Sequence, residues 1–101
     1  MRYVLKKRCL QKVARFYHNV SKKYKHTYSE ELLHQNIDNA INSVFQIEHT
    51  ILRREPTIKR WEGYYMAHAG KWYFAYTIEG EKIVVHDACH AQNMHEEEEK
   101  E

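Results

Sequence analysis

Glycine and proline are confined to the C-terminal half of this 101-residue chain, and their distribution constrains its fold more than any other feature. Neither occurs among residues 1–55, whereas Pro56, Gly63, Gly70 and Gly80 divide the residues that follow. Both residue types interrupt helices, so the first half is free to form long helices. The second half has the turn residues that short antiparallel strands need.

Apolar residues recur at helical spacing in two stretches of the first half. The first predicted helix covers residues 9–24 and the second residues 28–48, and we expect them to form an antiparallel hairpin. Thr27, followed three residues later by Glu30, has the capping-box pattern that begins a helix. The β-prone run RYVLKK predicts a strand before the first helix, and residues 49–62 predict a loop or an irregular edge strand.

After Gly63 the apolar pattern changes to a period of two, which is typical of β-strands. Three strands are predicted, with the sequences YYMAH, KWYFAYTI and KIVVHDAC, joined by turns at Ala69–Gly70 and at EGE. The order strand, helix, helix and antiparallel meander defines one α+β domain over residues 1–95, with the helical hairpin on one face of the sheet. The acidic residues 96–101, EEEEKE, are predicted to form a disordered tail.

Positive charge is concentrated in the first part of the chain. Residues 1–60 contain 13 basic and 5 acidic residues, a net charge of +8, whereas residues 61–95 have a net charge of −2. Such a field attracts nucleic acid or an acidic partner, although solvated helix faces explain the same composition.

No apolar run approaches the roughly 18 residues of a membrane span. The N-terminus also lacks the apolar stretch of a signal peptide, so we expect a cytoplasmic protein with no membrane partner.

Four of the eight histidines lie in the C-terminal third, which raises the question of a metal site. His86, His90 and His95 are separated by four and five residues, a spacing that matches no common zinc motif. In a strand, His86 and Cys89 also point to opposite faces. We therefore expect no metal and no other cofactor, and we expect Cys9 and Cys89 to be buried thiols.

Histidines beside aromatic rings are also typical of sites that cut RNA without a metal. Such a site needs a base for the 2′-hydroxyl proton and an acid for the leaving oxygen, and the pKa of histidine suits both roles. Aromatic rings hold splayed bases by stacking, worth roughly 1–3 kcal/mol per base. The candidates for proton transfer are His68, His90 and His95, and those for stacking are Trp72, Tyr65 and Tyr73. Ordinary, partly buried histidines explain these residue types at least as well, so both alternatives stay open.

Two runs of residues near the C-terminus resemble a known family. The run G-Y-Y-x-A-H-x-G-x-W-x-x-x-Y begins at Gly63, and the run I-V-V-x-x-x-C-H ends at His90. Together with the order of elements, they resemble the RelE/ParE superfamily of small toxins from bacterial type II toxin–antitoxin pairs. The resemblance implies a compact α+β fold and a neutralising antitoxin. It also implies either cleavage of mRNA in the ribosome or, in the ParE branch, inhibition of DNA gyrase.

Within the superfamily the chain looks most like the YafQ-like ribonucleases, which use histidines. The residues that match their motifs are Gly63, Tyr64, His68, Trp72 and His90. The resemblance implies that His68 and His90 transfer protons, so we expect them on neighbouring strands with their side chains on one face. Met94 stands where the family has an aromatic residue, and the adjacent His95 is expected to replace its polar function.

Two departures from these motifs concern charge. Tyr65 replaces the family's arginine, and Lys71 replaces its acidic residue. The basic network that RelE places around the phosphate has no counterpart in residues 61–95, so the transition-state charge must be met by Lys71 or by the basic residues of the loop. Those loop residues are Arg53, Arg54, Lys59 and Arg60.

These features predict the toxin of a type II toxin–antitoxin pair that cleaves mRNA on the ribosome. Its expected partners are an antitoxin, the ribosome and mRNA, and no cofactor is expected. The alternatives are a ParE-like inhibitor of DNA gyrase and a degenerate member that only binds its antitoxin.

Overall fold

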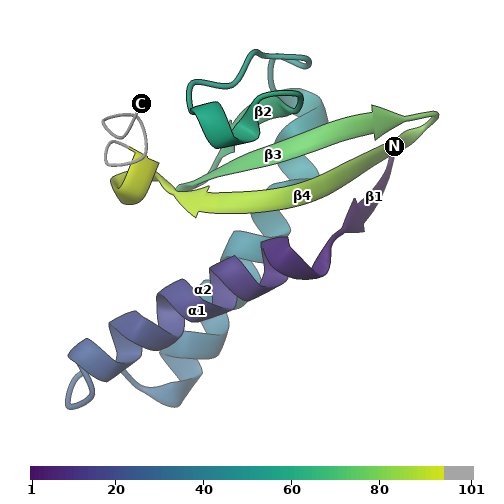
Figure 1. The fold of residues 1–101 in the computed structure, drawn as a ribbon. Coiled ribbons are helices and arrows are strands. Elements are labelled where there is room, and N and C mark those ends of the chain that lie inside the picture. The colour runs from purple at the N-terminus through teal and green to yellow at the C-terminus, as the bar shows by residue number, and fades with distance from the viewer. Residues whose placement is uncertain (95–101) are drawn as a thin grey trace.

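The computed structural model describes residues 1–94, so the predictions for His95 and for the acidic residues 96–101 lie outside the described residues. Within residues 1–94, a strand is followed by two helices and three further strands, as the sequence predicted (Figure 1). Both helices lie on one side of the sheet and extend beyond its edge. The chain is therefore an α+β domain.

The helical half follows the apolar pattern of the sequence. Helix α1 (Lys7–Lys23) buries Cys9 and Val13 in the main core. Helix α2 (Glu30–Ser43) continues directly into a 3₁₀ helix, η1 (Val44–His49). The chain reverses direction between α1 and α2, as expected for a hairpin (Figure 1).

The predicted cap of the second helix was wrong. Ser29 rather than Thr27 is the N-cap, because its hydroxyl accepts a hydrogen bond of 3.0 Å from the Leu32 N–H. The Thr27 hydroxyl donates instead to the Tyr24 carbonyl at 3.3 Å, within the turn that follows α1. Serine and threonine are both good caps, so the sequence pattern did not separate the two positions.

The sheet has four strands in the order β1-β4-β3-β2. Their bounds are Arg2–Leu5 for β1, Tyr65–Ala69 for β2, Trp72–Glu79 for β3 and Lys82–His90 for β4. The pairs β2–β3 and β3–β4 are antiparallel, which confirms the meander, whereas β1 runs parallel to β4 and makes the sheet mixed. A parallel pair needs a long crossover, and the helices lie within it.

The two faces of the sheet are covered by different parts of the chain. Trp72, Phe74 and Tyr76 of β3 face the helices and form the main core with them. Ala75 of β3 faces the other way, into a smaller cluster with Trp61 from the segment before β2. We call these the helix face and the loop face of the sheet.

The register between β3 and β4 contains a one-residue bulge. Tyr76 lies opposite Val85. Its neighbour Ala75 lies opposite Asp87, which leaves His86 as the extra residue of β4. Side chains alternate between faces along a strand, and a bulge interrupts this alternation. Odd-numbered residues of β4 therefore lie on the helix face before the bulge, and even-numbered residues lie there after it.

The turn between β2 and β3 lies close to α2. Gly70 has a φ of +62°, and a Cβ atom there would come within 2.6 Å of Ser43 Oγ and 3.3 Å of Ser43 Cβ. The Ser43 hydroxyl donates a hydrogen bond of 2.9 Å to the Asn39 carbonyl. Moving the Ser43 side chain would weaken this hydrogen bond and lower the free energy of unfolding. Glycine is therefore required here by both its φ and its lack of a side chain.

Gly70→Ala is expected to lower the free energy of unfolding by more than Gly80→Ala. Gly80 has a similar φ of +64° but open space around its Cβ position, so its substitution measures the backbone cost alone. That cost is about 1 kcal/mol, and Gly70→Ala should add roughly 1 kcal/mol by disturbing the Ser43–Asn39 hydrogen bond. Urea unfolding measures both variants. Equal losses would show that the turn gives way without disturbing α2.

Candidate nucleic-acid interface

The two histidines predicted to act together lie on opposite faces of the sheet, so the predicted pair is wrong. His68 on β2 lies opposite Tyr73 on β3, and Tyr73 lies opposite Cys89 on β4. These three residues share the loop face. His90 lies opposite Trp72, which faces the helices. The two strands are not neighbours either, because β3 lies between β2 and β4.

The bulge at His86 is the physical reason for this error. With unbroken alternation, Val85 on the helix face would place His90, five residues later, on the loop face with His68. The extra residue reverses this assignment. Strand β4 contains no glycine or proline, so its sequence carries no local mark of the bulge.

The exposed His68 and the half-buried Tyr73 stack on the loop face. Their rings stack with 4.3 Å between centroids and 9° between planes. Tyr65, which was predicted to lie beside them, faces the helices instead and packs against Tyr76 with 5.7 Å between ring centroids. The predicted set of aromatic residues is therefore divided between the two faces.

His90 lies between β4 and α1. Its imidazole stacks on Phe16 with 4.2 Å between centroids and 8° between planes, and it meets the Trp72 ring edge-on at 5.3 Å. Trp72 is buried and donates a hydrogen bond of 3.2 Å from Nε1 to the Tyr17 hydroxyl. Trp72 therefore shapes the site from within the core.

Two adjoining hollows open beside His90, with volumes of about 100 and 550 Å³, and Phe16, His90 and Asn93 line both. We call them together the His90 groove. Its basic side chains are Lys12, Lys23, Arg60 and Lys71. Its amide side chains are those of Asn19, Gln92 and Asn93. Within residues 1–94, none of the residues that line the groove is acidic.

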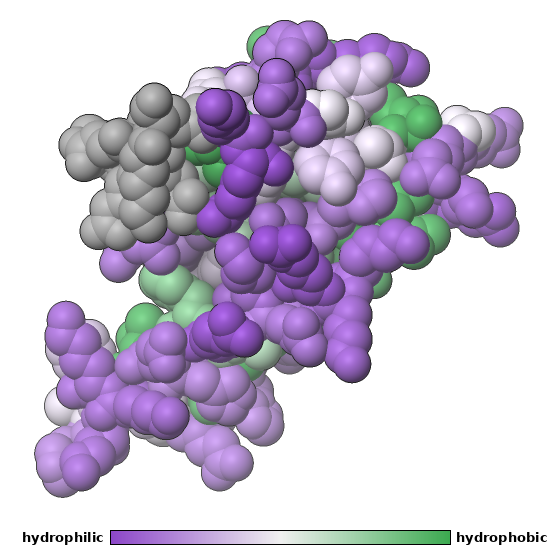
Figure 2. Space-filling view, viewed as in Figure 1, coloured by the Kyte–Doolittle hydropathy of each residue, from purple (hydrophilic) through white to green (hydrophobic). Residues whose placement is uncertain are grey.

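The outer part of the groove combines charge with an exposed ring. Tyr24 is 50% exposed, and Lys23 Nζ lies 5.5 Å from the centre of its ring. The side of the molecule that shows α1 is mostly hydrophilic, with small apolar patches between the polar side chains (Figure 2). Cations that track a backbone and rings on which bases stack are what single-stranded nucleic acid requires.

His90 is held in its neutral form. The Gln92 N–H donates a hydrogen bond of 3.2 Å to Nδ1, so the proton of the neutral ring is on Nε2. Burial lowers the pKa of His90 below the ordinary value of 6.5, and the charge of Lys71 lowers it further. Near neutral pH, His90 is therefore a hydrogen-bond donor through Nε2.

Asp87 is a buried carboxylate beside the groove, with only 4% of its surface exposed. Its Oδ2 accepts a hydrogen bond of 2.9 Å from Trp61 Nε1, and its Oδ1 accepts one of 2.9 Å from the Ala88 N–H. The basic side chains within 3.6 to 3.8 Å of its oxygens are those of Arg8, Lys12 and Arg60. Asp87 thus holds two of the groove's four cations, Lys12 and Arg60, in place.

The predicted basic residues of the loop are not gathered at one site. Arg60 reaches the His90 groove, where Lys71 also lies. Arg53 and Arg54 lie beside the sheet, where their backbone groups form hydrogen bonds of 2.9 Å with residues of β3 and β2. Lys59 lines a different hollow, which also contains two glutamates. Only two of the five predicted cations therefore meet His90.

A second polar cluster lies at the bulge, on the loop face. His86 Nε2 is 2.8 Å from Thr77 Oγ1, and the Thr77 hydroxyl donates a hydrogen bond of 3.0 Å to Glu79. The His86 ring stacks on Tyr64 with 4.8 Å between centroids. Burial lowers the pKa of His86, and the charge of Lys6 lowers it further. This cluster lies on the opposite face from His90.

The contribution of α1 to the site was not predicted. Phe16, Tyr17 and Tyr24 lie in the stretch of residues 9–24, which was predicted only to form a helix. One signal was present in the sequence, because Lys7–Lys23 contains six basic residues and no acidic residue. A helix of this composition with aromatic residues among its cations is suited to a nucleic-acid surface.

Cys9 and Cys89 are both buried thiols that form no disulfide, as predicted. Burial, with a smaller effect of Asp87, raises the pKa of the Cys9 thiol to about 12.

Within the described part of the chain, no three side chains of metal-binding type come together. In the same residues, no helix is long and apolar enough to cross a membrane.

Comparison with protein-family models, with curated proteins and with solved structures found no match to this chain. The resemblance to the RelE/ParE toxins therefore rests on the matched residues and on the order of elements.

Asp87→Ala is expected to lower the free energy of unfolding by about 2–3 kcal/mol, because Trp61 and the Ala88 N–H lose a charged acceptor. The surrounding cations are partly exposed and return to water, which keeps the cost below that of a fully buried pair. Asp38→Ala, at an exposed position of α2, is the control and should change the value by under about 0.5 kcal/mol. Similar losses for both variants in urea unfolding would contradict the structural role of Asp87.

Phe16→Ala is expected to raise the pKa of His90 toward 6.5, because water then reaches an imidazole that the Phe16 ring now covers. Lys71→Gln should raise it by less, since burial is the larger cause. NMR titration of the His90 ring measures both changes. A pKa at or above 6.5 in the unmodified protein would refute this account.

The lowered pKa of His90 also determines the direction in which the free energy of unfolding changes with pH. His90 binds its proton less readily in the folded state than in the unfolded state, so its contribution to stability is fully present above pH 6.5. That contribution is lost as the pH falls through the folded pKa.

Proposed function

We propose that the protein is the toxin of a type II toxin–antitoxin pair, and that it binds mRNA on the ribosome through the His90 groove. The groove carries this proposal, because four basic side chains, three amides and an exposed tyrosine surround one neutral imidazole. Phosphates bind to such cations, and bases stack on such rings. The residues that support the toxin family are Gly63, Tyr64, His68, Trp72 and His90.

In this proposal His90 donates a hydrogen bond from Nε2 to an oxygen of the RNA backbone. Its Nδ1 already accepts from Gln92, so the ring presents a donor and not a base. Lys71, whose charge affects the His90 pKa, supplies positive charge at the same place. This arrangement replaces the two-histidine mechanism that the sequence predicted.

Cleavage of the bound mRNA is the first of two candidate outcomes. It requires a proton acceptor for the 2′-hydroxyl in addition to His90. The second candidate is a member that binds its target without cutting, as the gyrase-inhibiting branch does. One observation favours this second candidate, namely that His68 and His90 lie on opposite faces of the sheet.

The proposed antitoxin is an acidic protein segment. Residues 1–60 have a net charge of +8, with 13 basic and 5 acidic residues, and complementary charge speeds and orients association. The basic helix α1 contributes to the His90 groove, so an acidic segment bound there would compete with RNA.

Induced expression followed by mapping of mRNA 5′ ends tests the function. Growth arrest with new 5′ ends inside codons, dependent on translation, selects cleavage. Arrest with intact mRNA and co-sedimentation with ribosomes selects binding alone, and DNA damage with intact mRNA selects gyrase. If expression causes no growth arrest and the protein does not associate with ribosomes, the proposed toxin function is refuted.

Lys71→Glu is expected to weaken binding of a single-stranded RNA hexamer and to flatten its salt dependence. Removing one cation from the bound phosphates reduces the slope of log K against log salt by about 0.7 for a single strand. Arg54→Glu makes the same change of charge outside the groove and should keep the slope of the unmodified protein. Fluorescence anisotropy over a KCl series measures both. Equal changes in the two variants would show that only net charge matters.

A further inference from the structure

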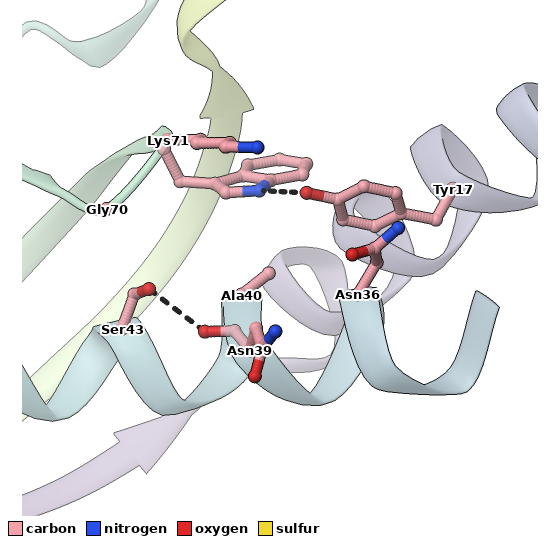
Figure 3. Close-up of a pocket in the computed structure, with 8 residues that line it drawn as sticks. Tyr17, Asn36, Asn39, Ala40, Ser43, Gly70 and Lys71 are labelled. Carbon is pink, nitrogen blue, oxygen red and sulfur yellow. Dashed lines mark hydrogen bonds between the residues drawn. The ribbon is translucent and has the colours of Figure 1, made fainter. Parts of the chain in front are cut away.

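A small pocket lies beside the His90 groove, where α2 approaches the turn between β2 and β3 (Figure 3). Its volume is about 220 Å³. Tyr17 and Lys71 line both this pocket and the larger hollow of the groove, so the two spaces adjoin. Lys71 and Gly70 are exposed, which leaves the pocket open to solvent at the turn.

The pocket combines neutral hydrogen-bonding groups with apolar surface. Asn36 and Ala40 project from α2 toward the hydrogen bond between Trp72 and Tyr17 (Figure 3). Asn36 Nδ2 donates to the hydroxyl of Tyr28, which is not among the residues that line the pocket, and this leaves its Oδ1 as an acceptor.

Apart from Lys71, the remaining polar groups of the lining are also neutral. The Tyr17 hydroxyl accepts from Trp72 and keeps its own proton to donate. Ser43 and Asn39 lie on α2 at the side nearer to Gly70, where the Ser43 hydroxyl donates to the Asn39 carbonyl (Figure 3).

We propose that this pocket binds one nucleobase of the RNA strand whose backbone occupies the His90 groove. The inference rests on the proposed binding of RNA and adds a subsite to it. A nucleobase has donors and acceptors along its edge and flat apolar faces, and the pocket offers amides, hydroxyls and ring surface for both. Lys71 stands at the junction of the two spaces, so a phosphate bound to it leaves the attached base within reach of Asn36.

The volume and the charge of the pocket exclude two other kinds of ligand, a drug-sized molecule and a phosphate. Pockets for drug-sized molecules span roughly 300–1,000 Å³, so a volume of about 220 Å³ suits a single ring system. A phosphate site needs several cations or N–H groups, whereas Lys71 is the only charged residue that lines this pocket within residues 1–94.

Asn36→Ala is the variant that tests the subsite, with Tyr28→Phe as its matched control. Both variants remove the hydrogen bond between Asn36 and Tyr28, but only the first changes the pocket. Anisotropy measurements use hexamers of adenosine, cytidine and uridine, together with an abasic hexamer of the same charge. Asn36→Ala should weaken the best-bound base-bearing hexamer about three- to tenfold, as for the loss of one hydrogen bond. It should leave the abasic hexamer unchanged, and Tyr28→Phe should bind all of them as the unmodified protein does.

The possible results distinguish failure of the nucleobase subsite from failure of the proposed RNA binding. If Asn36→Ala and Tyr28→Phe weaken binding equally, the effect comes from α2 and the pocket holds no base. The same conclusion follows if Asn36→Ala weakens the abasic hexamer as much as the others, or if it changes no affinity while Lys71→Glu still weakens RNA. If the unmodified protein binds no hexamer, the proposed RNA function itself fails. Thermal unfolding of each variant confirms that it is folded.

Discussion

The Asp87 carboxylate joins three parts of the chain that the sheet alone does not hold together. Trp61 brings the segment before β2 onto the loop face through its hydrogen bond to Asp87, and Lys12 brings α1 to the same carboxylate. Burial of a charge without partners is costly, so these contacts are required once Asp87 lies inside. The placement of Lys12 and Arg60, and with it half of the basic side chains of the His90 groove, depends on this one buried acid.

The charge of the groove and its orientation come from different residues. Lysine and arginine keep their charge across the physiological pH range, so attraction for phosphate changes little there. His90 adds no charge near neutral pH, because burial and Lys71 lower its pKa. His90 instead contributes a hydrogen-bond donor of fixed orientation, since the hydrogen bond from Gln92 and the stack on Phe16 fix where Nε2 points. A site of this kind suits the proposed RNA ligand in geometry as well as in charge.

The sequence predicted what local signals determine. The positions of glycine and proline and the change of apolar period identified the helical half and the meander. The site depended on signals that are not local. His90 stacks on Phe16, which is distant in the sequence, and its face was set by a bulge that no residue type marks. Ser29 and Thr27 show the same limit on a smaller scale, since both are suitable caps and only the fold chose between them.

The bulge also makes β4 unequally sensitive to a change of length. His86 is the residue in excess, so a deletion at this position would leave Asp87 and His90 opposite their present partners on β3. A deletion two residues later, at Ala88, would instead move Cys89 and His90 to the other faces. Such a deletion would bring His90 to the side of His68 and remove it from Phe16. The number of residues between Asp87 and His90, and not only their identity, therefore decides which histidines can meet the same ligand.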